Sequence, residues 1–406
     1  MSILTKPLLV RCLSSIMPHS LKYPKYFFQS QTWVDFASQA LGSNHQILKF
    51  LERLPHTNFD LEVFVYQYPW HLKQNLWYIP RFPGFDDSFI ESYNKISDSN
   101  NPDDSSLVEL QSQLKTAFKN LLQKILKQAR SSGITFLKLD FDDQICNILG
   151  ITSNQELLTF LKKQGIGFAL EISSKIIQFT GTMTLDLDLL VNVGPENQTK
   201  LIGSLDFLTE GLKNFYEKNS KYFLSWEKNT RRLTKHALDK NWQVSISKTQ
   251  ENFEGFYRLL KDTSARQNFA VQPKNYLQSL FDQDFSRIIV LKDQQGEAQA
   301  AWLGIVTEKT LTNLYAGNSQ ASHKENGQYL MHLAAIKLGL DEKLKFYDMG
   351  GYNSKLSFGK FKDGYKGDVR LFLGPIDILI KPRQFELSNF VIRLVKTILG
   401  KKDYEY

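Results

Sequence analysis

The chain has 406 residues, of which 42% are hydrophobic and 23% are charged, and its formal net charge is +8. This length predicts two or three domains, each large enough to bury a core. The charge favours an anionic partner, although many globular proteins are as basic without binding a polyanion. No stretch approaches the roughly 18 apolar residues of a membrane span, and the first residues lack the apolar region of a secretory signal. The composition therefore predicts a cytoplasmic protein.

Cysteine and histidine offer little for metal or disulfide chemistry. The two cysteines, Cys12 and Cys146, have no paired spacing, so neither a disulfide framework nor a cysteine-based metal site is expected. The seven histidines are scattered and form none of the short metal-binding motifs. We therefore expect no bound metal.

Strand-like and helical segments alternate along the chain, which predicts a mixed α/β fold. In the first half the segments are a strand at Leu8–Leu13, a helix at Trp33–Leu41, paired strands at Glu62–Gln67 and Leu76–Ile79, a helix at Leu107–Ala129 and a strand at Ile134–Phe141. The helix at 107–129 has the clearest pattern, because its apolar residues form one stripe. The polar run at 97–106 is predicted to be a solvated loop.

The second half repeats this plan after a junction near residues 170–180. Its predicted segments are a strand at Thr182–Leu187, helices at Phe207–Tyr222, Trp226–Asp239, Phe253–Thr263 and Tyr276–Phe281, strands at Ser286–Lys292, Ala298–Thr307 and Thr310–Tyr315, a helix at Glu325–Leu340 and a strand at Lys345–Asp348. The recurrence predicts two similar halves.

A last helix is predicted at Phe385–Leu399. Its apolar stripe contains Leu387, Phe390, Val391, Leu394, Val395, Ile398 and Leu399, with Arg393, Lys396, Lys401 and Lys402 beside it. A basic amphipathic helix of this kind can lie on an anionic membrane. More often such a stripe packs onto its own domain, and we expect packing here.

Short motifs follow one another in a fixed order. They are Phe27–Trp33 (FFQSQTW), Tyr78–Pro83 (YIPRFP), Thr184–Leu187 (TLDL), Arg231–Ala237 with Val244, Leu314–Ser319 (LYAGNS), Phe346–Gly351 (FYDMGG) and Phe361–Lys362. In this order and spacing they resemble the Fem (FemABX) family of peptidoglycan bridge-forming, tRNA-dependent aminoacyltransferases. The resemblance covers nearly the whole chain.

This resemblance implies two GNAT-like acyltransferase domains in tandem, residues 1–180 and 181–370, with residues 371–406 packing back onto the first. It implies an aminoacyl-tRNA as co-substrate, no other cofactor, and a muropeptide precursor as acceptor. An amino acid would be transferred to an amine of the stem peptide. Binding of the tRNA should weaken with salt, because Lys and Arg displace counterions from its backbone.

At two positions the chain departs from relatives that use UDP-linked precursors. Ala37 stands where they have a lysine four residues after Trp33, and Gln272 stands where they have an arginine four residues before Tyr276. In those relatives both cations hold the diphosphate, and each lost charged hydrogen bond weakens binding by roughly 1.5–3 kcal/mol. A lipid-linked acceptor is therefore favoured over a UDP-linked one. Such a lipid-linked acceptor would bring the protein into peripheral contact with the inner membrane face.

The implied reaction needs a positive donor. An amine that attacks an aminoacyl ester forms an oxyanion, and a preorganised cation at that oxygen is the largest help a protein can give. Lys362 is predicted to be this cation, with Phe361 holding its direction, unless it is simply one of several surface lysines. Asp348 is the third catalytic candidate, and either accepts a hydrogen bond from an ammonium or caps its turn.

The remaining candidates are predicted to bind substrate. They are Asp140, Tyr315, Tyr276, Arg81, Gly350, Gly351 and Arg266. The resemblance places Tyr315 and Asp140 toward the substrates and Tyr276 near the phosphates of the acceptor. The two glycines permit a positive φ or the close approach of a substrate. For Arg266, the alternative to substrate binding is a purely structural role.

Two other functions stay open. A CoA-dependent N-acyltransferase of the same double fold is disfavoured, because Lys324–Gln328 lacks the glycine-rich loop that binds pyrophosphate. A non-catalytic member that binds tRNA or a cell-wall precursor is the second alternative, and the Phe361–Lys362 pair argues against it.

Overall fold

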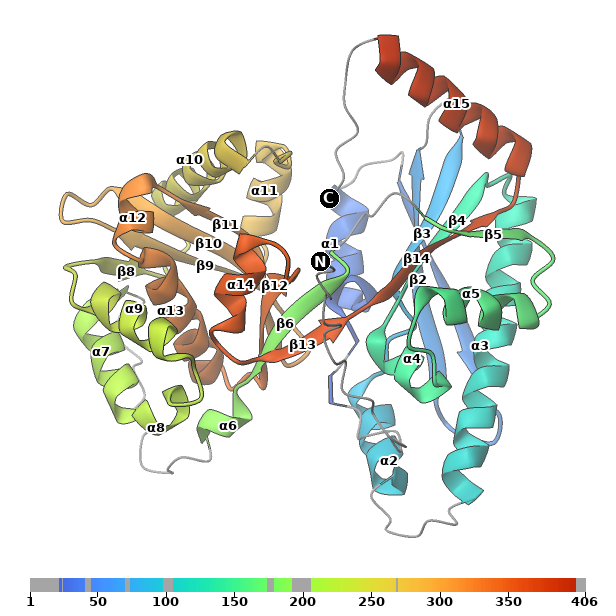
Figure 1. Ribbon diagram of the computed structural model, residues 1–406, viewed down its shortest axis with the longest axis horizontal. Helices are drawn as coiled ribbons and strands as arrows, with labels where there is room; N and C mark the ends of the chain where they lie inside the picture. The colour runs from blue at the N-terminus through green and yellow to red at the C-terminus, as the bar shows by residue number, and fades with distance from the viewer. Residues whose placement is uncertain are drawn as a thin grey trace, which may run out of the picture.

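The computed structural model describes residues 22–23, 25–40, 45–69, 74–97, 105–173, 179–191, 206–267 and 269–398. The predicted strand at Leu8–Leu13 lies outside these ranges. Figure 1 shows two lobes side by side, each built on one β-sheet with helices on its faces. The predicted mixed α/β class, with two sheets in tandem, is confirmed. No helix in the described part of the chain is both long and apolar enough to cross a membrane.

The first lobe has a six-stranded sheet in the order β1-β2-β3-β4-β14-β5. Its strands are β1 (Gln46–Arg53), β2 (Asp60–Pro69), β3 (Asn75–Phe82), β4 (Phe136–Phe141), β5 (Ala169–Ile172) and β14 (Leu373–Leu379). Strands β1 to β3 form an antiparallel meander, and β4 runs parallel to β3. Strand β14 pairs with both β4 and β5, so a C-terminal segment completes this sheet.

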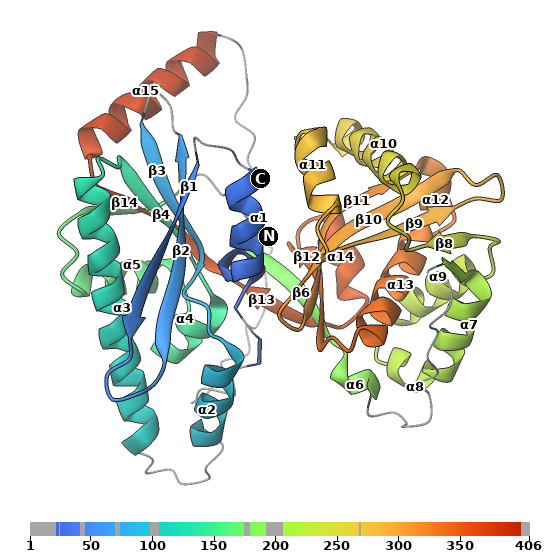
Figure 2. The ribbon, with the colours of Figure 1, turned by 180° about the vertical axis from the view of Figure 1, so that it is seen from behind.

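Helices cover both faces of the first sheet. They are α1 (Gln31–Ala40), preceded by the short 3-10 turn η1 (Phe27–Gln29), α2 (Asp87–Ser97), α3 (Ser105–Ser131), α4 (Asp143–Leu149) and α5 (Asn154–Lys163). The predicted stripe of α3 is confirmed, because its apolar residues from Leu110 to Leu126 are buried against the sheet. Helix α1 lies on the side that faces the second lobe (Figure 2).

The second lobe has an eight-stranded sheet in the order β13-β6-β12-β11-β10-β9-β8-β7. Its strands are β6 (Gly181–Asp186), β7 (Asp206–Leu208), β8 (Gln243–Ser245), β9 (Ser286–Lys292), β10 (Ala298–Thr307), β11 (Thr310–Asn318), β12 (Phe346–Gly351) and β13 (Asp368–Leu371). Strands β9 to β11 form a meander and β12 runs parallel to β11, the same plan as β1 to β4. The superposition of the halves, and the boundaries at 180 and 370, stay predictions.

The helices of the second lobe are α6 (Asp188–Val191), α7 (Thr209–Lys218), α8 (Ser220–Phe223), α9 (Lys228–Leu238), α10 (Gln250–Gln267), α11 (Lys274–Phe281), α12 (Gln320–Lys324), α13 (Gly327–Asp341) and α14 (Ser357–Asp363). The predicted helix at Phe207–Tyr222 is wrong at its start. Residues 206–208 instead pair with β8 as an edge strand, because their backbone groups find partners there.

A shared apolar cluster joins the two lobes. It packs η1 and α1 of the first lobe against α10, α11 and the sheet of the second, and includes Phe27, Trp33, Phe36, Phe253, Phe256 and Leu280. Burying one apolar side chain of this kind contributes about 1.5–3 kcal/mol to the free energy of unfolding. The cluster therefore fixes how the two sheets face each other.

Helix α15 (Pro382–Ile398) crosses the end of the first sheet. The expectation that its apolar stripe packs onto the domain is wrong, because Leu387, Phe390 and Leu394 are 56%, 63% and 49% exposed. The inner face is set instead by Phe385, whose ring lies 4.8 Å from that of Phe136 on β4. At 3.6 residues per turn, this anchor turns the stripe to the opposite side.

Candidate active site

The site begins where two parallel strands of the second sheet separate. Strand β12 pairs with β11 only from Thr310–Phe346 to Thr312–Asp348, whereas β11 continues along β10 as far as Asn318. Beyond this point Gly350 has a φ of +79°, which L side chains rarely adopt, and the chain turns away from β11. The separation leaves the part of β11 beyond Thr312 without a paired strand on this side.

Helix α14 directs Lys362 back onto this turn. The Lys362 Nζ donates to the carbonyl oxygens of Gly350, at 3.0 Å, and Gly351, at 2.5 Å. The residue is only 8% exposed, so it is not one of the surface lysines. Burial lowers the pKa of Lys362 to about 8, although the Asp348 carboxylate opposes this shift. Two N–H groups of a protonated lysine are thus engaged, and the third lies outside these two bonds.

Asp348 supports the turn from within. Its Oδ1 accepts the Gly350 N–H at 2.7 Å and also the hydroxyl of Thr182 on β6. Burial raises the pKa of Asp348, whereas the bonds from Thr182 and Gly350 and the charge of Lys362 lower it. Of the two alternatives for this residue, the geometry is that of a turn cap.

Phe361 packs away from the turn and against α13. Its ring centroid lies 4.9 Å from Tyr329, 5.5 Å from Tyr365 and 5.4 Å from His332. Because these rings belong to α13 and to the segment directly after α14, Phe361 anchors α14 and so fixes the direction of its neighbour Lys362.

Arg81 and Asp140 approach the site from the first lobe. The Arg81 Cζ lies 3.6 Å from the ring centroid of Phe372, and its Nη2 donates to the carbonyl of Phe179. Its Nη1 lies 4.0 Å from Asp140, which accepts a hydrogen bond from Tyr78. Burial raises the pKa of Asp140, and the Arg81 charge opposes this shift.

Phe179 connects these residues to the turn. A Cβ added at Gly351 would lie 2.1 Å from the Phe179 ring, and this ring also packs at 5.7 Å against Phe358 of α14. The structure therefore brings Arg81 and Asp140 close to the segment that carries Gly350, Gly351 and Lys362.

The other predicted residues lie elsewhere. Tyr315 and Tyr276 both pack on the apolar cluster between the lobes, where Tyr276 lies 5.6 Å from Phe36. Burial raises the pKa of Tyr315 to about 12, so its hydroxyl stays protonated at neutral pH. Arg266 is exposed and binds the carbonyl of Asn318 at the end of β11. Its contact is with the backbone, and the structure does not bring it to Lys362.

The sequence interpretation missed three side chains around Asp348. They are Thr182, Tyr26 and Arg370; the last two line a cavity of about 20 Å³ beside Asp348, roughly the size that one water molecule requires. Arg370 on β13 also donates to Asp143 at 2.6 Å and to Asp142 at 3.2 Å across the junction of the lobes. One feature of the sequence could have pointed to Arg370: two adjacent acidic residues, Asp142 and Asp143, directly follow the β4 strand and need a cation if they are buried.

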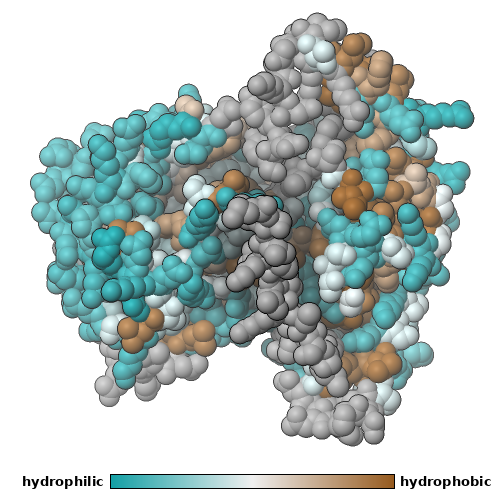
Figure 3. Space-filling model, viewed as in Figure 1, coloured by the Kyte–Doolittle hydropathy of each residue, from teal (hydrophilic) through white to brown (hydrophobic). Residues whose placement is uncertain are grey.

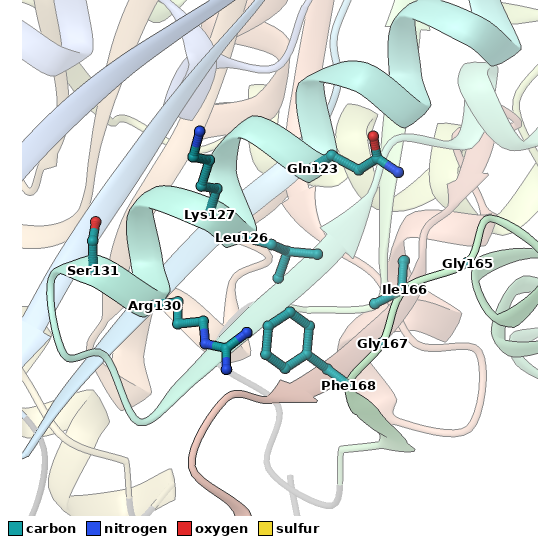
Figure 4. A pocket seen from close by; sticks show the side chains of 9 residues that line it. All are labelled: Gln123, Leu126, Lys127, Arg130, Ser131, Gly165, Ile166, Gly167 and Phe168. Carbon is teal, nitrogen blue, oxygen red and sulfur yellow. The ribbon is translucent and has the colours of Figure 1, made fainter.

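A larger groove lies far along the first lobe. It has a volume of about 410 Å³ and is lined by Gln123, Leu126, Lys127, Arg130, Ser131, Gly165, Ile166, Gly167 and Phe168 (Figure 4). None of the predicted site residues lines it. Among the described residues, no group of three or more His, Cys, Asp or Glu side chains is placed to hold a metal ion.

The backbone at Gly350 gives the first testable prediction. A Cβ at this position would lie 2.7 Å from the carbonyl oxygen of Asn313, in addition to the cost of a positive φ. We expect Gly350→Ala to lower the free energy of unfolding by about 1–3 kcal/mol. It should also displace the carbonyl that holds Lys362. Gly296→Ala is a matched control, because it has a φ of +84° with no atom near its Cβ. Equal losses in the two variants, measured by urea unfolding, would show that the contact with Asn313 is unimportant.

Comparison with known proteins finds one matching family model and several solved structures of similar outline. Residues 283–393 match the sequence model of the FemAB family, and no curated protein matches the chain. The crystal structure of FemX matches 90% of this chain and 94% of its own, with a TM-score of 0.58 and 15% identity.

Two further solved structures resemble the chain in outline. One is the C-terminal domain of a putative lysylphosphatidylglycerol synthetase from Agrobacterium fabrum, with 11% identity, coverage of 89% and 95%, and a TM-score of 0.45. The other is a tandem GNAT protein from the clavulanic acid biosynthesis pathway, with 8% identity, coverage of 88% and 90%, and a TM-score of 0.42. At 15% identity, the match to FemX shows a likeness of fold alone.

Proposed function

We propose, starting from the match of residues 283–393 to the FemAB family, that this chain is an aminoacyltransferase. It would move an amino acid from aminoacyl-tRNA to an amine of a peptidoglycan precursor stem peptide and so build the interpeptide bridge. The observation that carries this proposal is the buried Lys362 ammonium, held on the carbonyls of Gly350 and Gly351 where β11 and β12 separate.

The reaction assigns a role to each group. The acceptor amine attacks the ester carbonyl, a C–N bond forms, the C–O bond to the tRNA ribose breaks, and the amine proton passes to the released hydroxyl. Lys362 uses its third N–H to stabilise the oxyanion that forms on the carbonyl. Asp348 keeps the turn closed through the Gly350 N–H, so the lysine needs no rearrangement during the step.

The surroundings of Tyr276 support a lipid-linked acceptor. Ala37 is 2% exposed and lies in the apolar cluster between the lobes, where Phe36 contacts Tyr276. Neither position carries a positive charge, because residue 37 is an alanine and residue 272 a glutamine. A nucleotide diphosphate would find two fewer charged partners here than in relatives that use UDP-linked precursors.

The start of α13 argues against the CoA-dependent alternative. Helix α12 is inserted between β11 and α13, and a Cβ at Gly327 would lie 2.2 Å from the hydroxyl oxygen of Ser322. The residue before α13, Asn326, has a φ of +64°. This close packing leaves little room for a pyrophosphate on the first amides of α13, which is where a helix binds such a group.

A transfer assay tests the proposal. The purified chain is incubated with a mixture of charged tRNAs and with lipid-linked or UDP-linked muropeptide, and the product is weighed by mass spectrometry. We expect a mass increase of whole aminoacyl residues, faster on the lipid-linked acceptor. Transfer from acetyl-CoA, but not from tRNA, would favour the CoA alternative. Binding of both substrates without any product would favour the non-catalytic one.

A further inference from the structure

The outer face of α15 carries apolar side chains that nothing in the described chain covers. Leu387, Phe390 and Leu394 follow one another at spacings of three and four residues and are each about half exposed or more. Figure 3 shows hydrophobic side chains gathered over α15, at the top of the view. A surface helix of a globular protein normally faces its apolar stripe toward the core. An outward-facing stripe therefore indicates a surface that binds something else.

The helix cannot simply roll over to hide the stripe. Phe385 is 7% exposed and packs on Phe136, and Ser388 is fully buried. Rolling α15 would bring Phe385 into water and break the packing that also includes Leu379 and Tyr78. The outward orientation is therefore built into the fold.

The sequence of α15 is basic. Helix α15 contains Arg383, Arg393 and Lys396 but only one acidic residue, Glu386. Directly before it, the Nζ of Lys381 donates to the carbonyl of Gly133 at 2.7 Å, which places the end of α3 beside the start of α15.

The last turns of α3 add two further cations. Lys127 and Arg130 line the groove of about 410 Å³, where the Arg130 side chain extends toward Phe168 (Figure 4). Neither residue forms an ion pair with another described residue. Exposed apolar side chains flanked by free cations are the pattern of a helix that lies in a membrane surface.

We propose that α15 and the basic end of α3 form a docking surface for an anionic phospholipid bilayer. The apolar stripe would enter the acyl boundary, while Lys127, Arg130 and Arg383 meet the phosphate groups. A protein partner fits less well, because three side chains cover only a few hundred Å², against the roughly 800 Å² per partner of a stable interface. The inference deepens the proposed function, since a lipid-linked acceptor would be met at this surface.

Vesicle binding tests this inference without any aminoacyl-tRNA, so its failure is distinct from a failure of transfer. The full chain is sedimented with vesicles of phosphatidylcholine alone or with added phosphatidylglycerol. We expect binding to the anionic vesicles that decreases with salt. The variant Leu387→Ser/Phe390→Ser/Leu394→Ser should bind at least tenfold more weakly, with an unchanged melting temperature.

Two further variants separate charge from burial. Lys127→Glu/Arg130→Glu should bind anionic vesicles about 25-fold more weakly or worse, at about fivefold per basic residue. Val108→Ser is the matched control, because Val108 is 69% exposed but lies at the opposite end of α3. It should bind like the unchanged protein. The proposal is overturned if the unchanged protein does not bind anionic vesicles, or if the triple serine variant of α15 binds them equally well. It is also overturned if sedimentation analysis shows that these α15 side chains hold two copies of the chain together.

Discussion

Lys362→Ala is expected to lose about 10²–10³ of kcat, the usual cost of removing one donor to an oxyanion. The charge on the ester oxygen develops only as the transition state forms, so the lysine lowers the barrier more than it tightens substrate binding. We therefore expect nearly unchanged KM values for both substrates. Steady-state kinetics with lipid-linked acceptor, together with a melting curve to show that the variant folds, make the measurement.

Neighbouring lysines provide the control for this variant. Lys360 lies on the same helix but is exposed, and Lys355 is exposed in the preceding turn. Alanine at either position should leave kcat within about twofold, because an exposed, unpaired cation contributes little. Lys366 is a poorer control, since it forms an ion pair with Glu227. If Lys362→Ala and Lys360→Ala had the same kcat as the unchanged protein, the catalytic assignment would be wrong.

The pH dependence separates an acid role from a base role for Lys362. Burial lowers the pKa of this lysine to about 8, so the donating, protonated form is lost as the pH rises through that value. We expect kcat to fall above pH 8. Lys362→Arg should retain only part of the activity, because a planar guanidinium cannot take the position of an ammonium, but its activity should not fall there. A kcat that rises through pH 8 and depends on Lys362 would identify a general base instead.

Arg370→Met is expected to cause the largest loss of stability, about 3–5 kcal/mol, because it leaves the buried Asp142 carboxylate and the half-buried Asp143 carboxylate without their cation. Arg370 is 5% exposed and Asp142 is 0% exposed, and Asp143 accepts hydrogen bonds from both Nε and Nη2 of the guanidinium. These contacts join β13 of the second lobe to the start of α4 in the first. Urea unfolding at pH 8 measures the loss, which should affect the junction of the lobes first.

The sign of the pH effect follows from Asp142. Burial raises the pKa of Asp142 to about 7 even though Arg370 lowers it, so ionising this carboxyl costs stability as the pH rises through that value. Without the arginine the cost grows. Arg370→Met should therefore lose much more stability at pH 8 than at pH 5, where the carboxyl is protonated.

Two variants complete the test of this pair. Adding Asp142→Asn and Asp143→Asn to Arg370→Met should restore part of the stability. Arg258→Met removes an exposed arginine paired with Glu297, and it should cost less than about 1 kcal/mol. A loss in Arg370→Met no greater than in Arg258→Met would contradict the importance of the buried contact.

The sequence alone determined those features that arise from local periodicity and from motif order. The stripe of α3 was predicted correctly, because a helix with one buried face repeats its apolar residues at its own period. Strands β9 and β10 were predicted correctly for another reason: both are buried on both faces and appear in the sequence as short apolar runs. Strand β1 was missed, since Lys49, Glu52 and Arg53 interrupt any apolar alternation on this exposed edge. Likewise β13 has only four residues, three of them exposed, and depends on β6 for its hydrogen bonds.

Only the tertiary structure decided how the candidate residues meet. Motif order singled out Lys362, but its burial and its bonds to Gly350 and Gly351 depend on α14 folding back over β12. Arg370 reaches Asp143 only because β13 bridges the two lobes. For α15 the sequence determined an apolar stripe but not its direction. One contact, between Phe385 and Phe136, turned that stripe to the outside, because the same periodicity is compatible with either face until a neighbour fixes the rotation of the helix.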